Sequence, residues 1–218
     1  RSHPRVLDDL HGTTWPLPLL GGENGSGAIV PLIAETGGQN CMVVDSSALI
    51  EQTVDDMVTS AFSSAGQRCS ALRVAFVQED IADELLSVLK GAVEQLQVGD
   101  PALLETDIGP VIDAEAQAML EAHSERMTRE AKSIAKASSA RGLYFPPQVF
   151  EIPSIEVLKG EVFGPILHVV RYKADALGEV IEAINSTGYG LTFGIQRRMD
   201  AHIELLSTRV HAGNIYVN

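Results

Sequence analysis

The sequence has few cysteines and a shortage of positive charge. Only two cysteines occur in 218 residues, Cys41 and Cys69. A small secreted scaffold held by disulfides needs more, so we expect a reducing compartment, the cytoplasm. The chain carries 16 basic against 29 acidic side chains, a formal net charge of −13. Such a field repels polyanions, and we expect no nucleic acid contact from this region.

Long apolar runs are also missing. No stretch approaches the roughly 18 apolar residues that span a bilayer. Residues 1–9, RSHPRVLDD, lack the apolar centre of a secretory signal. The six histidines show no pairing at metal-ligand spacing, and no metal site is predicted. What remains is a composition with 45% hydrophobic residues, enough to bury a core.

The first 29 residues differ from the rest of the chain. They contain prolines, a Gly/Ser cluster and no hydrophobic periodicity, which predicts an irregular N-terminal segment over 1–29. Their glycines do not form G-x-G-x-x-G, and no predicted strand leads into them. A phosphate-binding loop is therefore not predicted there.

From residue 30 onward, predicted strands and helices alternate. Apolar runs with β-branched residues predict strands, and apolar side chains at i, i+4 and i+7 predict helices. This alternation predicts an α/β fold with a mainly parallel open sheet and helices on both faces, as one domain over 30–218. The strands are predicted at 30–35, 41–45, 72–78, 148–152, 166–172, 191–196 and 214–218, and the helices at about 47–64, 81–96, 114–137, 175–186 and 201–208.

Three predicted loops set an ionisable side chain beside glycines. AETGGQN contains Glu35, GQRCS contains Cys69, and EVFGP contains Glu161. Glycines let other backbone or ligand atoms approach closely. Cys41, inside an apolar strand, is typical of a structural cysteine, whereas Cys69 has the cation Arg68 beside it, which favours a thiolate. Each carboxylate taken alone could be an ordinary surface charge.

Together the three loops are more specific. E-x-G-G is followed by G-Q-x-C after 34 residues (69 minus 35), and E-x-F-G-P follows after 92 more (161 minus 69). This order resembles the aldehyde dehydrogenase superfamily from about residue 30 to the end. The longer motifs are similar to the 1-pyrroline-5-carboxylate dehydrogenase branch, above all to the aldehyde dehydrogenase region of the bifunctional proline utilization A flavoenzymes. These motifs include SAFSSAGQRCSALRV, DIGPVID, EVFGPILHVVRY, STGYGLTFGI and GNIYVN.

The resemblance implies an NAD-dependent enzyme of proline catabolism. It would oxidise L-glutamate 5-semialdehyde, formed from 1-pyrroline-5-carboxylate, to L-glutamate. By resemblance, Cys69 is the nucleophile that forms the thiohemiacetal and thioester, and Glu35 is the general base that activates water. Glu161 would bind the nicotinamide ribose, Phe163 would lie beside the nicotinamide, and Ser70 would help to hold the substrate carboxylate.

The resemblance covers only the catalytic domain of the family. The cofactor domain and the oligomerisation arm have no counterpart here, so we expect the isolated chain to be inactive and to bind little or no NAD. The implied partners are the small aldehyde, the cofactor domain of the same parent chain, and further copies in a homo-oligomer. A flavin, or peripheral membrane contact, is expected only through other domains of the parent protein, such as an upstream proline dehydrogenase.

Three other interpretations stay open at this point. The chain could be a non-catalytic structural or interaction module, or part of a dehydrogenase for another aldehyde. It could also be a thiol hydrolase, which requires a histidine to activate Cys69, with His123 or His168 as candidates. The choice between NAD and NADP and the oligomeric state stay open as well.

Overall fold

A computed structural model describes residues 37–138 and 141–218, and most of these belong to one compact unit over 38–218. The predicted irregular segment at 1–29 and the predicted strand at 30–35 lie outside the described residues. The prediction for Glu35 lies outside them too.

Within this unit, seven strands form one sheet with the order β3-β4-β5-β2-β1-β6-β7. Every neighbouring pair is parallel except β3 with β4, so the prediction of a mainly parallel sheet is confirmed. β1 and β2 are buried at every residue, as expected for a parallel sheet covered on both faces. The strands are β1 (Asn40–Val44), β2 (Leu72–Gln78), β3 (Lys132–Lys136), β4 (Gln148–Glu151), β5 (Ile166–Tyr172), β6 (Thr192–Gln196) and β7 (Asn214–Val217).

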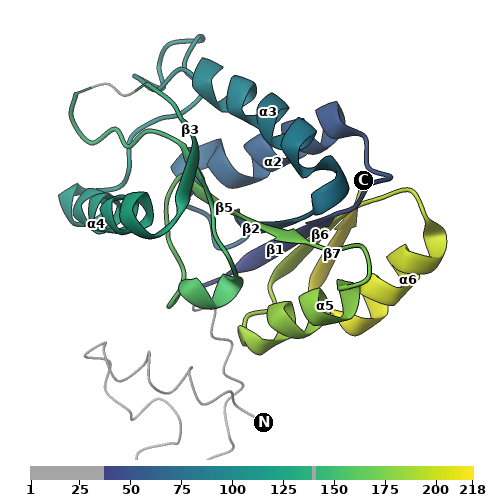
Figure 1. Cartoon of the computed structure of the whole chain (residues 1–218). Coiled ribbons are helices and arrows are strands. Elements are labelled where there is room, and N and C mark those ends of the chain that lie inside the picture. The colour runs from purple at the N-terminus through teal and green to yellow at the C-terminus, as the bar shows by residue number, and fades with distance from the viewer. Residues whose placement is uncertain (1–36, 139–140) are drawn as a thin grey trace, which may run out of the picture. The chain divides into compact units, whose positions relative to one another are not determined.

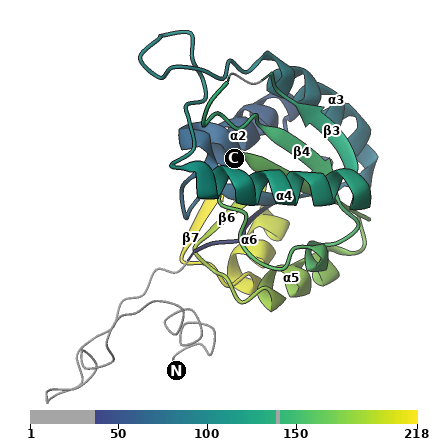
Figure 2. The same ribbon diagram turned by 90° about the vertical axis from the view of Figure 1, so that its left-hand side faces the viewer.

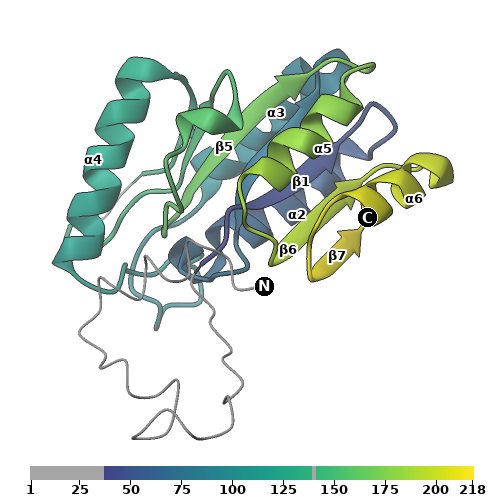
Figure 3. The same cartoon turned by 90° about the horizontal axis from the view of Figure 1, so that it is seen from below.

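Helices cover both faces of the sheet, as predicted. α2 (Ile50–Phe62) and α3 (Glu79–Gln95) lie on one face, and α5 (Leu177–Ser186) and α6 (Asp200–Arg209) lie on the other (Figures 1 and 3). α4 (Ala114–Glu130) flanks the sheet at its β3–β4 end (Figure 2). None of the helices in the described part of the chain is long and apolar enough to cross a membrane.

The apolar stripes read from the sequence are the buried stripes of the helices. α2 buries Val54, Met57 and Ala61, at the spacing of one helical face. α3 buries Leu85 and Leu89 together with Val93. These two helices pack on one another and on the central strands, and the loop that contains Cys69 runs from the end of α2 to the amino end of β2.

The predicted helix at 114–137 is wrong beyond residue 130. α4 ends at Glu130, the next residue has an extended backbone (φ −137°, ψ 171°), and β3 follows as an antiparallel partner of β4. Alanine and lysine are good helix formers, but intrinsic preference contributes little energy per residue, and pairing with β4 overrides it. Ala135 is buried in this pairing.

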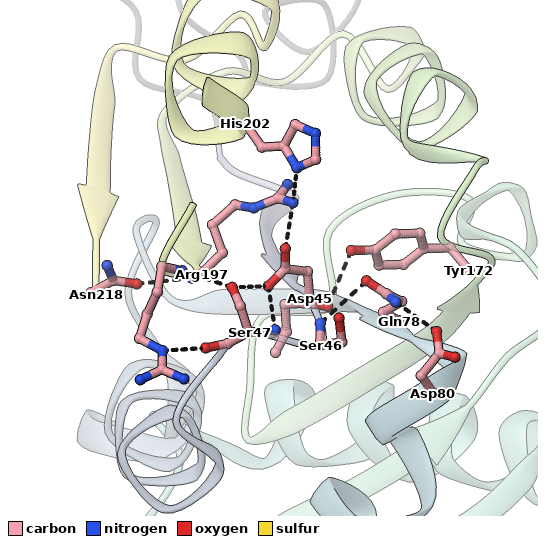
Figure 4. A network of polar contacts seen from close by, with 11 residues as sticks. Asp45, Ser46, Ser47, Gln78, Asp80, Tyr172, Arg197, His202 and Asn218 are labelled. Carbon is pink, nitrogen blue, oxygen red and sulfur yellow. Dashed lines mark hydrogen bonds and ion pairs between the residues drawn. The ribbon is translucent and has the colours of Figure 1, made fainter. Parts of the chain in front are cut away.

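The carboxyl ends of the central strands are joined by a polar network (Figure 4). Asp45 follows β1 and Arg197 follows β6; the two form an ion pair with side chains at most 5% exposed. Arg197 also contacts the Nδ1 atom of His202, and its main-chain N–H donates to Oδ1 of Asn218 over 2.9 Å. At the carboxyl ends of these strands, the polar side chains are therefore bonded to one another within the protein.

Candidate active site

The Cys69 turn lies at the amino ends of the strands, whereas that network lies at their carboxyl ends. Cys69 stands three residues before β2, while Asn40 and Thr192 are the first residues of β1 and β6. Since these strands are parallel, all three positions meet at the amino ends of the strands. Ligands of open α/β sheets usually bind beyond the carboxyl ends, so this site departs from the general rule. The Cys69 side chain is partly exposed and carries a free thiol.

Four consecutive carbonyls of this turn are held by side chains from neighbouring strands. Asn40 Nδ2 donates to the carbonyl oxygens of Cys69 over 2.6 Å and of Ala71 over 2.8 Å. Thr192 Oγ1 donates to the carbonyl of Ser70 over 3.2 Å. The Arg68 carbonyl accepts a hydrogen bond from the Nη2 atom of Arg73, on β2, over 3.1 Å.

The fixed carbonyls determine where the main-chain N–H groups point. In a trans peptide the N–H is directed away from its own carbonyl. With the Arg68 carbonyl turned to Arg73, the N–H of Cys69 points away from Arg73; by the same geometry the N–H of Ser70 points away from Asn40. Neither N–H has a hydrogen-bond partner among the residues that the structure describes. N–H groups oriented in this way beside a thiol are suited to stabilising an oxyanion.

Glycines allow the three loops to interlock. Ser64, Ala65 and Gly66 have positive φ angles of 58°, 52° and 64°, a left-handed run that turns the chain sharply before Cys69. A Cβ atom at Gly66 would collide with the carbonyl oxygen of Gly164, in the EVFGP loop. A Cβ atom at Gly38 would collide with the carbonyl oxygen of Cys69. Gly38 and Gly66 are therefore needed for backbone-to-backbone contact between the loops.

Glu161 reaches the same cluster. Its side chain is 15% exposed and forms an ion pair with Arg73 over 3.3 Å, and the main-chain N–H of Gly38 donates to its carboxylate. Burial raises the pKa of Glu161, an effect that the positive charge of Arg73 opposes. Phe163 is 44% exposed, and its ring centroid lies 5.5 Å from the guanidinium carbon of Arg73.

Sequence reasoning missed Arg73 and Asn40 as parts of this cluster. The available signal for Arg73 was a single charged residue inside the apolar strand LRVAFV, since arginine is rarely buried without a partner. Asn40 had a weaker signal, an amide just before an apolar strand. Apart from Arg68, their partners lie 29 to 152 residues away along the chain, which no local pattern reveals.

Ser70 and Arg68 border a groove on the α2 side of the sheet. Its volume is about 450 Å³, and strands β1, β6 and β7 form its floor. The Nη2 atom of Arg68 donates to the carbonyls of Thr59 and Ser60 at the end of α2, over 3.2 and 3.1 Å. Arg68 therefore has a packing role at the helix end, while the hydroxyl-bearing Ser70 stands beside the open space.

The two histidines proposed as alternative bases for the thiol are engaged with each other. His123 Nε2 lies 2.9 Å from His168 Nε2, and His168 Nδ1 lies 3.1 Å from the carbonyl oxygen of Arg73. A carbonyl only accepts, so His168 Nδ1 donates and His123 Nε2 donates to His168 Nε2. This arrangement disfavours the thiol hydrolase interpretation.

The other cysteine behaves as the sequence predicts. Cys41 is buried at 3% exposure within β1, and burial raises the pKa of its thiol. A neutral, enclosed thiol is inert. Of the two cysteines, only Cys69 is open to a reactant.

Comparison with known proteins identifies the class to which this fold and this cysteine turn belong. The sequence model of the aldehyde dehydrogenase family matches residues 22–218, so the chain belongs to the aldehyde dehydrogenase family. The bifunctional protein PutA of Klebsiella aerogenes is 49% identical over 201 residues, which cover 88% of this chain and 15% of that protein. The 1-pyrroline-5-carboxylate dehydrogenase of Geobacillus kaustophilus is 36% identical over 191 residues, covering 86% of this chain and 37% of that protein.

Solved structures give the same result. A crystal structure of bifunctional proline utilization A superposes with a TM-score of 0.86 at 53% identity, over 88% of this chain and 20% of that one. The 1-pyrroline-5-carboxylate dehydrogenase from Thermus with bound NAD superposes with a TM-score of 0.77 at 32% identity, over 84% of this chain and 36% of that one. The chain thus spans less than two fifths of the length of these relatives.

Proposed function

We propose that this chain is the catalytic part of an NAD-dependent dehydrogenase that oxidises L-glutamate 5-semialdehyde, derived from 1-pyrroline-5-carboxylate, to L-glutamate in proline catabolism. The observation that carries the proposal is the partly exposed Cys69 thiol in a turn whose four carbonyls are held by side chains. The names of the similar proteins, PutA and 1-pyrroline-5-carboxylate dehydrogenase, support the choice of substrate.

In the proposed mechanism Cys69 is the nucleophile. Its sulfur bonds to the aldehyde carbon, and the carbonyl oxygen becomes an oxyanion that accepts from the Cys69 main-chain N–H. After oxidation the same carbon remains bound as a thioester. Glu35 takes a proton from water, the hydroxide attacks the thioester, and glutamate leaves as the thiolate is restored. Ser70 is proposed to hold the substrate carboxylate.

The residues present suit the nicotinamide end of NAD. The Glu161 carboxylate is an acceptor of the kind that ribose hydroxyls need, and Arg73 and Gly38 hold it in place. The half-exposed ring of Phe163 offers a flat apolar face of the kind that packs against an aromatic ring. Bound NAD would supply the hydride acceptor. We propose Glu161 and Phe163 as its contacts on this chain.

Selective labelling of the two thiols tests the proposal on this chain. Iodoacetamide at pH 7.5 should modify Cys69 at least about tenfold faster than Cys41, because a buried thiol is neutral and shielded. Peptide mass spectrometry gives the two rates. A Cys41→Ala variant should keep the fast phase, and Cys69→Ala should lose it. Equal, slow modification of both thiols would instead favour the non-catalytic module.

Turnover tests the substrate. A polypeptide that joins this chain to a dinucleotide-binding domain of the family should reduce NAD with glutamate semialdehyde, followed at 340 nm. The Cys69→Ala variant should lose at least about 10³-fold in kcat, because the covalent step has no substitute. Full activity of that variant, or a strong preference for an unrelated aldehyde, would contradict the proposal.

A further inference from the structure

Arg73 joins the Cys69 turn to the loop that carries Glu161. Its side chain is 1% exposed, in the interior of β2. Nη1 donates to the carbonyl of Gly164 over 3.0 Å, and Nη2 contacts both the Arg68 carbonyl over 3.1 Å and the Glu161 carboxylate over 3.3 Å. One guanidinium thus holds the main chain on both sides of the site and the carboxylate between them.

The electrostatics of this position indicate a cost. Burial lowers the pKa of the Arg73 guanidinium, and the charge of Glu161 opposes that effect. Burying an ion pair is seldom the most stable solution, since apolar side chains of similar volume often do as well or better. An arginine at this place is therefore better explained by the groups that it holds than by the stability that it adds.

We propose that Arg73 is a positioning residue, which fixes the Glu161 carboxylate in register with the nucleophile turn. This inference rests on the proposed function, in which Glu161 binds the nicotinamide ribose. Through Arg73 the ribose contact and the sulfur would share one anchor. A displaced carboxylate would then weaken cofactor binding even though Arg73 touches no cofactor.

The geometry requires the shape of arginine as well as its charge. The guanidinium is a planar fork with several donors, and here two of its nitrogens serve three acceptors. The ammonium of a lysine is a compact charge on a flexible stem, and it cannot span Gly164 and Arg68 together. Arg73→Lys should therefore keep the attraction to Glu161 but lose part of the alignment.

Arg197, at the carboxyl ends of the strands, provides a matched control. Arg197 is also buried at 4% exposure and also pairs with a carboxylate, that of Asp45 (Figure 4). Its substitution removes a similar buried ion pair at the carboxyl ends of the strands. Any effect common to Arg73→Gln and Arg197→Gln reports general stability, and any effect of Arg73→Gln alone reports the site.

The decisive measurement is a double-mutant cycle on KM for NAD in the joined polypeptide described above. Arg73→Gln should raise KM about tenfold or more, with a smaller change in kcat, and Arg73→Lys should raise it less. In a Glu161→Gln background the further change Arg73→Gln should raise KM by less than about twofold, because the two residues act as one unit. Arg197→Gln should leave KM unchanged.

Two results would overturn the inference. One is an equal rise in KM from Arg73→Gln with and without Glu161, which would mean an action independent of the carboxylate. The other is an unchanged KM in a folded Arg73→Gln or Arg73→Lys protein. Protection of Cys41 from iodoacetamide shows that a variant is folded, and Arg73→Lys decides the matter if Arg73→Gln does not fold.

A second readout separates this inference from the proposed function. If the wild-type protein does not oxidise the aldehyde, the proposed function fails. Hydrogen exchange on the 218-residue chain still tests Arg73. Arg73→Lys should speed amide exchange over 161–164 and 68–71 together, about tenfold, while Arg197→Lys leaves both segments unchanged. Unchanged exchange in both segments would contradict the role of Arg73 whatever the reaction.

Discussion

The carbonyls of the Cys69 turn depend on a few distant side chains, and Asn40 holds two of them. Its Nδ2 donates to Cys69 and Ala71, and its Oδ1 accepts from the main-chain N–H of Thr192 over 3.0 Å. Asn40→Ala should lower the free energy of unfolding by about 2–4 kcal/mol, because buried polar groups lose their partners. Asn40→Asp should lower it as well, by placing a negative charge against two carbonyl oxygens.

Urea unfolding followed by circular dichroism gives these free energies. Gln95→Ala, an exposed substitution at the end of α3, is the control. Asn185→Ala is unsuitable as a control, because the Asn185 side chain bonds to the main chain at the end of α6. A loss below about 0.5 kcal/mol for Asn40→Ala would show that the turn keeps its shape without this side chain.

Gly66 gives a second prediction for a single residue. Alanine there must adopt φ +64° and meet the Gly164 carbonyl, so Gly66→Ala should cost at least about 2 kcal/mol of unfolding free energy. Gly91 is the control: it lies within α3 with open space around its Cβ position, and Gly91→Ala should stabilise by about 0.5–1 kcal/mol. The same urea titration compares them. Equal effects of the two substitutions would contradict the interlocked loops.

Among single residues, the sequence predicted the contrast between the two cysteines but not the frame around the second. Cys41 is buried within an apolar strand, as its neighbours indicated, and Cys69 lies in a polar turn. The sequence did not predict Arg73 and Asn40 as parts of the site, because their roles depend on partners elsewhere in the chain. The roles of Glu35, Glu161, Phe163 and Ser70 stay predictions, and Glu35 lies outside the described residues.

At the scale of the elements, the α4–β5 contact introduces a pH dependence. Burial lowers the pKa of His168 to about 3 and that of His123 to about 4, both below the ordinary value. The unfolded chain therefore binds protons that the folded protein excludes. The stability is fully present above about pH 6.5 and falls as the pH drops toward 4.

This dependence can be measured as the unfolding free energy at pH 7 and at pH 5. The fully buried His168 alone should account for a loss of about 2 kcal/mol over this interval. His168→Leu should reduce the loss, whereas the exposed His211, replaced by Gln, should not. An identical loss in wild type and His168→Leu would show that other groups cause it.

The misassigned end of α4 shows why one element could not be read from the sequence. The segment AKSIAKA contains good helix formers, and its alternation is too short to outweigh them. β3 exists because β4 offers an edge to pair with, a contact between Lys132–Lys136 and Gln148–Glu151. The other described strands and α-helices lie within a few residues of their predicted ranges.

At the scale of the whole molecule, we expect the cofactor to need more than this chain supplies. The proposed contacts, Glu161 and Phe163, address only the nicotinamide end, and the relatives with which the chain aligns are more than twice as long. Calorimetry should give no saturable heat for NAD at micromolar concentrations with the 218-residue chain. Micromolar affinity would refute this expectation. The joined polypeptide serves as the positive control.

The side-chain frame around the turn has a practical consequence for work on this protein. Since Asn40, Thr192 and Arg73 hold the carbonyls of the turn, its backbone conformation does not depend on the Cys69 sulfur. Replacing it with a hydroxyl or a methyl group, as in Cys69→Ser or Cys69→Ala, should leave the backbone undisturbed. Such inert variants would be suitable for crystals with the proposed aldehyde substrate bound but unreacted.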